Sequence, residues 1–222
     1  MDKSMRYIIQ VLIAIIAFCT ITLNAVTTSQ TDVVVDGTLF QINESMKEMS
    51  TFSAKFKQVK KFRILASPML LEGSIYINRS PFKLAWNIEK PIGYTAIISE
   101  DRLLQWDKET GSTKEYKFSD NPMLGMIAKT YHDILLGDFS RIVKECDIAV
   151  DKPAYTINVT PMANSKMSKA VSKITFTFNK DFCYLVAISI DEPGGNSTTI
   201  DFSDIKLNSA IPEKAWIAGN DS

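Results

Sequence analysis

Few residues of this sequence could perform catalysis together. His132 is the only histidine among 222 residues, and Asp133 follows it directly. A Ser-His-Asp triad is defined by geometry and not by sequence order, so these two residues could belong to one. The chain contains no Gly-x-Ser-x-Gly motif, which would present a nucleophilic serine on a tight turn. A lone histidine inside a predicted helix is more often structural, and we expect a protein that is not an enzyme.

The sequence also contains no pattern that is typical of a metal or cofactor site. A zinc site needs three or four ligands, and Cys146, Cys183 and His132 do not have the spacing of such a set. No glycine-rich loop of the phosphate-binding kind occurs. We therefore expect no metal ion and no cofactor.

The charge balance argues against a nucleic-acid partner. The chain has 25 basic and 25 acidic residues, a net charge of zero and 45% hydrophobic residues. Such a composition is typical of a globular protein and provides no broad basic surface. Five basic residues gather between Lys55 and Arg63, and we interpret them as a solvated strand face.

The N-terminus has the pattern of a secretory signal peptide. Lys3 and Arg6 precede a nearly uncharged run over residues 7–23, and Ala25 offers a small residue for cleavage. We expect residues 1–25 to be a cleaved signal peptide, residues 33–217 to form one domain, and the mature protein to lie in the periplasm. An uncleaved membrane anchor and a lipidated Cys19 are the alternatives.

Two cysteines remain beyond the leader. An oxidising compartment permits a disulfide between Cys146 and Cys183, but two cysteines make no framework. The two predicted strands that carry them are separated by two others, so in a simple meander they would not be neighbours. Two buried free thiols are the simpler interpretation.

Two segments show the spacing of amphipathic helices. From Asp36 to Met49, apolar residues recur at steps of three and four, and polar residues occupy the other side. From Pro122 to Leu136 the same spacing follows an Asn-Pro start and stops before Gly137. We predict one helix before the first strand and another inserted between strands.

Elsewhere the period is two, which is typical of half-buried strands. The residues that share a face in each predicted strand are Phe52, Ala54 and Phe56; Ile75 and Ile77; Phe82, Leu84, Trp86 and Ile88; Tyr155, Ile157 and Val159; Ile174, Phe176 and Phe178; Tyr184, Val186, Ile188 and Ile190; and Ile200 and Phe202. Short strands also lie at 94–99 and 103–107. Regular strands with turns between them indicate a mainly β, antiparallel meander that approaches a barrel. The alternation cannot separate a filled core from a ligand cavity.

An ordered series of motifs resembles the LolA family of periplasmic lipoprotein carriers. The segment from Phe52 to Gln58 is similar to the family's F-x-A-x-F-x-Q opening, and residues 72–77 to its E-G-x-[LI] strand. Residues 79–86 resemble its R-P…F-x-W stretch, and Pro91 and residues 97–101 follow in the family's order. Ser80 between Arg79 and Pro81 departs from the pattern, as does the sequence 104–107. The chain therefore resembles a divergent member.

The resemblance implies an unclosed antiparallel half-barrel with a helical lid. It implies a hydrophobic cavity that binds acyl chains, and Arg79 as a latch that bonds to the lid backbone and holds the empty state closed. The cavity residues that we expect are Phe56, Ile75, Ile77, Leu84, Trp86, Ile97, Leu104, Trp106, Met123, Leu124, Ile127 and Phe176.

The implied function is a monomeric carrier that moves lipoproteins or lipids from the inner to the outer membrane. Each buried methylene contributes about 0.8 kcal/mol, so an anchor of roughly 45 methylenes is held in a bilayer by tens of kcal/mol. This exceeds the ceiling near 20 kcal/mol for non-covalent affinity, so a carrier needs an energy-driven inner-membrane donor complex and an outer-membrane acceptor. A lipid-sensing periplasmic regulator domain and a glycolipid shuttle paired with another exporter are the alternatives.

Overall fold

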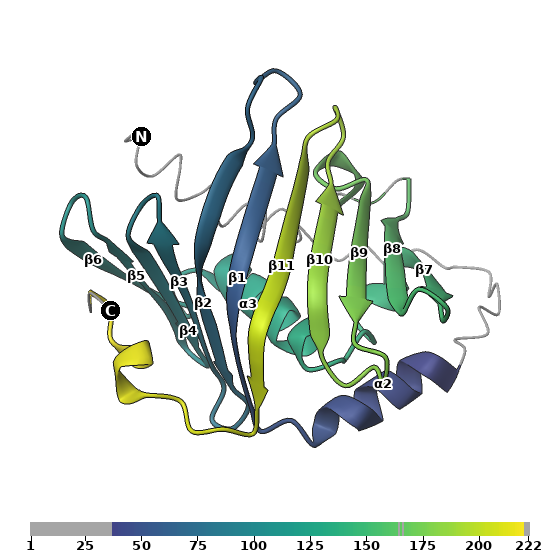
Figure 1. The fold of residues 1–222 in the computed structure, drawn as a ribbon, viewed down its shortest axis with the longest axis horizontal. Coiled ribbons are helices and arrows are strands. Elements are labelled where there is room, and N and C mark those ends of the chain that lie inside the picture. Colours follow the sequence, from purple (N-terminus) through teal and green to yellow (C-terminus); the bar gives the residue numbers. More distant parts are fainter. Residues whose placement is uncertain (1–36, 164, 166, 220–222) are drawn as a thin grey trace.

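The computed structural model describes residues 37–163, 165 and 167–219, and the predicted signal peptide, anchor alternative and Cys19 lie outside them. The main body is one antiparallel sheet of eleven strands in the order β6-β5-β4-β3-β2-β1-β11-β10-β9-β8-β7 (Figure 1). The strands are β1 (Thr51–Lys61), β2 (Met69–Asn78), β3 (Lys83–Lys90), β4 (Tyr94–Ser99), β5 (Arg102–Asp107), β6 (Ser112–Lys117), β7 (Cys146–Asp151), β8 (Thr156–Pro161), β9 (Lys173–Phe178), β10 (Leu185–Asp191) and β11 (Ser197–Leu207).

The sheet does not close, because β6 and β7 form its two edges. Helix α2 (Gly37–Lys47) lies along the lower end of the sheet, and α3 (Pro122–Leu135) lies against one face of it (Figure 1). The fold is therefore the mainly β half-barrel with a helical lid that the sequence predicts. Both helix predictions are confirmed within two residues. No helix of the described residues is long and apolar enough to cross a membrane.

The burial of the side chains shows which face of the sheet lies inside. In β1 every second residue from Phe52 to Lys60 is buried, and the residues between them are half-buried or exposed. Residues directly opposite each other in an antiparallel pair share a face, and Phe52 pairs with Ile77, which pairs with Leu84. The inner face is thus a largely apolar wall, and α2 and α3 cover it.

A bulge changes the inner face of β10. The register with β9 shifts between Leu185 and Ala187, so Leu185 is buried and Val186 is only half-buried. The prediction of one strict alternation from Tyr184 to Ile190 was wrong here, because a bulge inserts one extra residue and moves the next side chain to the other face. The edge strand β6 was not predicted, since its sequence is polar and it is largely exposed.

Helix α3 has well-defined ends. The Asn121 side chain accepts a hydrogen bond from the Leu124 amide, and Pro122 occupies the first turn. At the other end the Gly137 amide donates to Ile134 and the Asp138 amide donates to Asp133, which is the Schellman pattern of helix termination. Gly137 has a φ of +78°, so glycine is favoured there.

Helix α2 packs directly on Gly137. A Cβ atom at this position would lie 2.8 Å from Met46 Sδ and 3.4 Å from the Ile42 carbonyl oxygen. Ile42 and Met46 are almost fully buried. The two helices therefore meet where α3 ends, and the missing side chain of Gly137 lets them approach.

The segment after β11 covers part of the outer face. It includes a short 3-10 helix (Glu213–Trp216) in which Ala215 is buried. Lys83 Nζ lies 5.8 Å from the Trp216 ring centroid, and Gly219 lies against the Trp106 ring. The outer face of β3 and β5 is thereby partly apolar and shielded.

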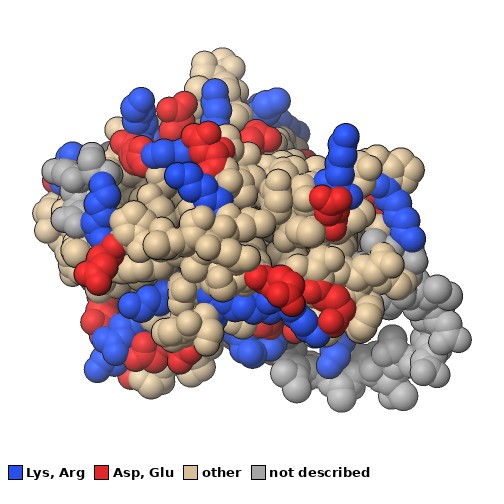
Figure 2. All heavy atoms as spheres, turned by 60° about the horizontal axis from the view of Figure 1, so that its bottom comes forward, with Lys and Arg blue, Asp and Glu red and all other residues tan. Residues whose placement is uncertain are grey.

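Charges of both signs are interspersed on the face shown in Figure 2, in agreement with the zero net charge. One lysine of the group between Lys55 and Arg63 is not solvated. Lys60 lies on the inner side of β1, is 5% exposed, and pairs with Glu192 at 2.9 Å. The interpretation of this group as one exposed face was wrong for Lys60.

Candidate functional site: the inner wall of the half-barrel

The centre of the inner wall is an aromatic stack. Phe56 on β1 and Trp86 on β3 stack with ring centroids 4.2 Å apart, although β2 runs between their strands. Gly73 on β2 makes this possible, because a Cβ there would lie 2.9 Å from the Phe56 ring and 1.9 Å from the Asn87 carbonyl oxygen. The glycine of the E-G-x-[LI] motif thus leaves the space through which two distant rings meet.

Six of the predicted cavity residues lie on this wall. Phe56, Ile75, Ile77, Leu84, Trp86 and Phe176 are all buried members of the one hydrophobic core. Leu124 on α3 is partly buried and packs against the same core. Met123 and Ile127 also belong to α3, but their side chains lie outside the described part of the structure.

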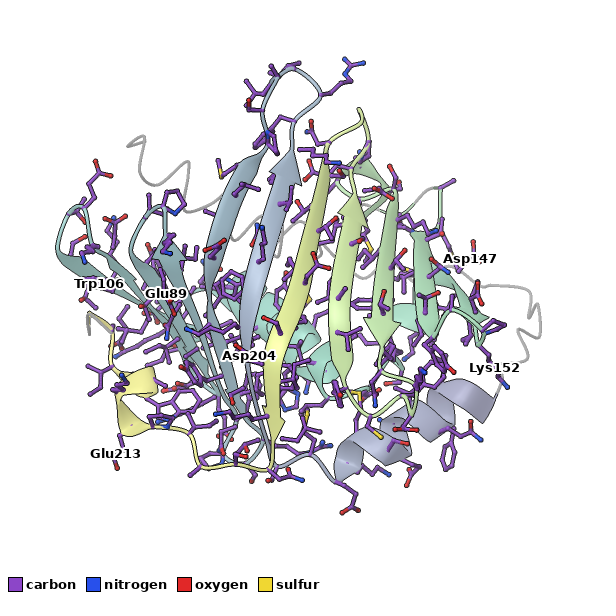
Figure 3. All side chains as sticks on the ribbon, viewed as in Figure 1. Glu89, Trp106, Asp147, Lys152, Asp204 and Glu213 are labelled. Carbon is purple, nitrogen blue, oxygen red and sulfur yellow. The ribbon has the colours of Figure 1, made fainter. Side chains whose placement is uncertain are left out.

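Three predicted cavity residues lie on the opposite face. Ile97 pairs with Ala85 and Leu104, and Trp106 pairs with Thr95, whereas Leu84 and Trp86 pair with Ile98 and Ala96. Their assignment to the cavity was wrong. Trp106, near the edge of the sheet (Figure 3), packs against the C-terminal segment, since a Cβ at Gly219 would lie 3.1 Å from its Nε1.

A hollow of about 270 Å³, counted together with its open part, lies where α2 meets the wall. Its lining residues are Met46, Met49, Phe52, Ile75, Ile77, Leu135, Tyr184, Leu185 and Phe202. Only Ile75 and Ile77 belong to the predicted cavity set. The helical spacing of Met46 and Met49 would have been enough to predict these two residues, and the alternation that includes Phe56 would have been enough for Phe52. Leu185 could not be predicted, because the bulge in β10 interrupts the alternation there.

Arg79 connects the strands to α2. Its Nη1 donates a hydrogen bond of 2.6 Å to the Met46 carbonyl oxygen, and its amide donates to the Ser50 carbonyl. The last carbonyls of a helix have no partner inside it, and the helix C-terminus favours a cation. Arg79 therefore caps α2 at the point where the chain enters β1.

Asn208 supports the same junction from β11. Its side chain accepts a hydrogen bond from the Ser50 amide at 2.7 Å and donates to the Glu48 carbonyl at 3.1 Å. In addition, the Asn43 amide nitrogen donates to the Gly137 carbonyl at 3.4 Å. A small number of polar contacts thus holds α2 over the wall, beside the apolar contacts of Ile42 and Met46.

Polar groups are also buried in the wall. Burial, together with the charges of Tyr116 and Asp107, raises the pKa of Tyr94 far above its usual value, so its hydroxyl stays protonated. The Gln58 carbonyl oxygen, the Thr198 hydroxyl, the Trp86 indole nitrogen and the Tyr94 hydroxyl are buried without a hydrogen-bond partner among the described residues.

His132 does not sit in a catalytic arrangement among the described residues. Its Nδ1 lies 3.0 Å from Asp133 Oδ1, and its ring packs edge-on against Phe82. Asp133 also accepts from Arg141 Nε at 3.1 Å, so this group links α3 to the following turn. No serine hydroxyl contacts His132 within the described part, which also contains no cluster of three potential metal ligands.

The two cysteines are free thiols that do not pair with each other. Cys146 is buried in β7, and burial raises the pKa of its thiol to about 12. Cys183 precedes β10 and is only half-buried, so the expectation that both thiols are buried was wrong for Cys183.

Solved structures share this fold at low sequence identity. The crystal structure of MucB matches with a TM-score of 0.52 and 11% identity over 85% of this chain and 64% of that one. The Pseudomonas aeruginosa MucA/MucB complex matches at 0.50 and 13% identity over 82% and 59%. The Mycobacterium tuberculosis lipoprotein LppX matches at 0.48 and 16% identity over 80% and 98%. This chain therefore spans about three fifths of the MucB chains.

No curated protein matches the chain. A family model does: the one described as "Outer membrane lipoprotein carrier protein LolA" matches residues 47–216, which run from the end of α2 to the C-terminal 3-10 helix. This range includes every strand of the sheet, α3, Arg79 and the Phe56–Trp86 stack. With the open sheet, the apolar inner wall and the covering helices already described, the match shows that the chain belongs to the LolA family of outer membrane lipoprotein carriers.

Proposed function

We propose that this protein binds the acyl chains of lipoproteins or lipids against the inner wall of its half-barrel and carries them across the periplasm, from the inner to the outer membrane. The observation that carries the proposal is the largely apolar inner face of β1, β2 and β3, which helices α2 and α3 cover. Helices held by few polar contacts can move aside where a closed core could not.

Binding then requires the lid to open. Pockets for small ligands have volumes of about 300–1,000 Å³, whereas the 270 Å³ of the hollow beneath α2 includes open solvent and its enclosed room is only about that of a water molecule. The wall is otherwise filled by the protein's own side chains. Displacing α2 from Ile77 and Phe202 would join this hollow to the rest of the wall, and Met46 and Met49 could repack around a chain because methionine is flexible.

Arg79 is the proposed latch. Opening breaks its hydrogen bond to Met46, and an acyl chain that fills the wall replaces the contacts of Ile42 and Met46. The carrier thus gives up apolar contacts within itself when it makes apolar contacts with the cargo. The net free energy of binding is therefore much smaller than the free energy of burying the acyl chains alone. An energy-driven donor and a tighter acceptor remain necessary for a triacyl cargo.

The test combines native mass spectrometry with a binding assay. Protein purified without detergent should release acyl-containing species, and delipidated protein should bind a fluorescent lipid probe. Leu84→Glu places a charge on the inner wall and should abolish probe binding, whereas Lys57→Glu on the exposed outer face of β1 should not. Absence of both bound lipid and probe binding in folded wild-type protein would refute the proposal without reference to any variant.

A second candidate function is a lipid-sensing regulator, for which the likeness to MucB is the specific observation. MucB is solved in a complex with MucA, and this chain shares its fold. A regulator would form a stable complex with the periplasmic part of a membrane protein. Pull-down from solubilised membranes separates the two functions, because a carrier should yield only transient contacts with a donor or an acceptor.

A further inference from the structure

Four polar atoms on the inner wall are buried without a hydrogen-bond partner among the described residues. They are the Gln58 carbonyl oxygen, the Thr198 hydroxyl, the Trp86 indole nitrogen and the Tyr94 hydroxyl. Gln58 is 1% exposed and Thr198 is fully buried. We call these four groups the polar belt. Buried polar groups in folded proteins are nearly always paired, so a set of unpaired ones on a single surface calls for an explanation.

The belt crosses five neighbouring strands. Thr198 on β11 pairs with Lys60, the next inward residue of β1 after Gln58, so Gln58 and Thr198 are diagonal neighbours. On the other side of Gln58, Phe56 reaches over Gly73 to stack on Trp86. Tyr94 pairs with Ile88, the next inward residue of β3 after Trp86. The register thus places the four groups in a row across the inner face, with β2 contributing none of them.

Several other buried polar groups of the described residues are paired, although Asn87 Oδ1, on the outer face of β3, also lacks a hydrogen-bond partner there. Lys60 bonds to Glu192 at 2.9 Å, although both lie beside the belt. On the outer face, Thr175 donates to Asn158 at 2.9 Å. Four of the unpaired groups thus share the inner face of the sheet, the face that α2 and α3 cover. A hydrocarbon chain would leave all four unpaired, so the wall suits a ligand that is not hydrocarbon alone.

We propose that the polar belt binds the ester and amide groups that link acyl chains to the rest of the ligand. Thr198, Trp86 and Tyr94 can each donate to an ester or amide carbonyl oxygen, and the Gln58 carbonyl can accept from an amide N–H. The apolar positions around them, such as Phe56 and Ile75, would contact the chains. This inference rests on the proposed function and specifies the ligand class: acyl lipids with carbonyl linkages, distinguished from alkyl lipids without them.

The test uses two lipids that differ only in the linkage. A diacylglycerol with short acyl chains carries ester carbonyls, and the dialkyl ether glycerol of equal chain length does not. Competition against a fluorescent probe gives the affinity of wild-type protein for each. Thr198→Val and Tyr94→Phe remove one hydroxyl each and keep the shape of the side chain. Thr177→Val, on the outer face of β9, is the matched control.

We expect wild-type protein to bind the ester lipid more tightly than the ether lipid. Each belt variant should lose roughly three- to tenfold in affinity for the ester lipid and should bind the ether lipid as before. Gln58→Leu should weaken the binding of an N-acylated peptide by a similar factor, because leucine cannot accept a hydrogen bond from the amide N–H of the peptide. The control Thr177→Val should change neither affinity.

A stability measurement provides an independent readout. If the belt is unpaired in the empty protein, Thr198→Val and Tyr94→Phe should melt at the wild-type temperature or above it, since replacing an unsatisfied buried group by an apolar one is neutral or stabilising. Lower melting temperatures for these two variants, with Thr177→Val unchanged, would mean that the hydroxyls bond within the fold and would overturn the inference. Equal binding of ester and ether lipids would also overturn it, while failure of both lipids to bind would refute the proposed function itself.

Discussion

At the scale of single residues, Arg79 links α2 to the strands of the sheet. Its hydrogen bond to the Met46 carbonyl caps α2, and its amide bonds to the entry of β1. Arg79→Met removes a bond with a charged donor, which contributes about 1.5–3 kcal/mol. We expect α2 to detach more often, so limited proteolysis should cut near residues 48–50 faster and probe uptake should accelerate.

The control for Arg79 is Arg102→Met, which alters an exposed arginine at the start of β5 that pairs with Asp101 and with Glu115 on the edge strand β6. Exposed pairs contribute little, so proteolysis near α2 should stay at the wild-type rate. Proteolysis and uptake that are unchanged in Arg79→Met would show that this residue is a helix cap only.

Glu89 predicts how stability depends on pH. Burial alone would raise the pKa of this carboxyl, but hydrogen bonds from Ser74 and Lys55 and the charges of Lys55 and Lys90 hold it below its ordinary value of 4.5. A lowered folded-state pKa means that the contribution is complete above pH 4.5 and is lost as the pH falls below it. Glu89→Gln should therefore flatten the acid side of the stability curve, measured by denaturant melts between pH 3 and 6. A curve that falls as steeply as the wild type would contradict this.

Single residues also show where sequence reasoning succeeded and where it failed. Phe56, Ile77 and Leu84 were assigned to the inner wall correctly, because polar outward neighbours made the alternation clear. Ile97 and Trp106 were assigned to it wrongly, because the outer face of β4 and β5 also carries apolar residues, and alternation identifies two faces without telling which one is inside. The burial of Lys60 depends on its ion pair with Glu192, and a local sequence pattern cannot predict a partner so distant in the chain.

At the scale of elements, α2 and the end of α3 meet at Gly137. Gly137→Ala places a methyl group against Met46 and adds the cost of a left-handed backbone, roughly 1–2 kcal/mol. We expect lower stability and a displaced α2. Gly194→Ala is a matched control, because Gly194 also has a positive φ but no atom lies within 4 Å of its would-be Cβ.

The difference between the two glycine variants isolates the helix contact. Both variants are destabilised by the left-handed backbone conformation, but only Gly137→Ala disturbs α2. The unfolding free energy of Gly137→Ala should therefore fall further than that of Gly194→Ala, and its probe uptake should rise. Equal losses in the two denaturation curves, with equal uptake, would show that α2 does not depend on this approach.

The helices and central strands could be predicted from periodicity, and their order along the chain agreed with the family likeness. The edge strand β6 could not, because an exposed edge needs no apolar face and Tyr116 is the one residue of Ser112–Lys117 that packs against the core. The β10 bulge was equally hidden, since Leu185 and Val186 are both apolar and only the pairing with β9 decides which one faces inward. Elements whose burial depends on distant partners are thus the ones that local pattern misses.

At the scale of the whole molecule, the sheet and its lid should respond to a ligand in opposite ways. The sheet is one unit, in which β1 is paired along its length with β2 and β11, whereas α2 is held by Arg79, Asn43 and a few apolar contacts. Regions with few contacts open at lower free energy than the core. If cargo takes the place of α2 on the wall, the ligand should shift the population towards the open state.

Amide hydrogen exchange measures this directly. With saturating lipid, exchange in α2 (residues 37–47) should become faster, while exchange in β1 and β11 should become slower, because ligand binding stabilises the folded sheet by mass action. Arg79→Met should show the faster α2 exchange even without ligand, and Lys57→Glu should not. Uniform slowing of exchange over both sheet and helix would mean that lipid enters beneath a lid that stays closed. The proposed displacement of α2 would then be refuted, although lipid binding itself would be confirmed.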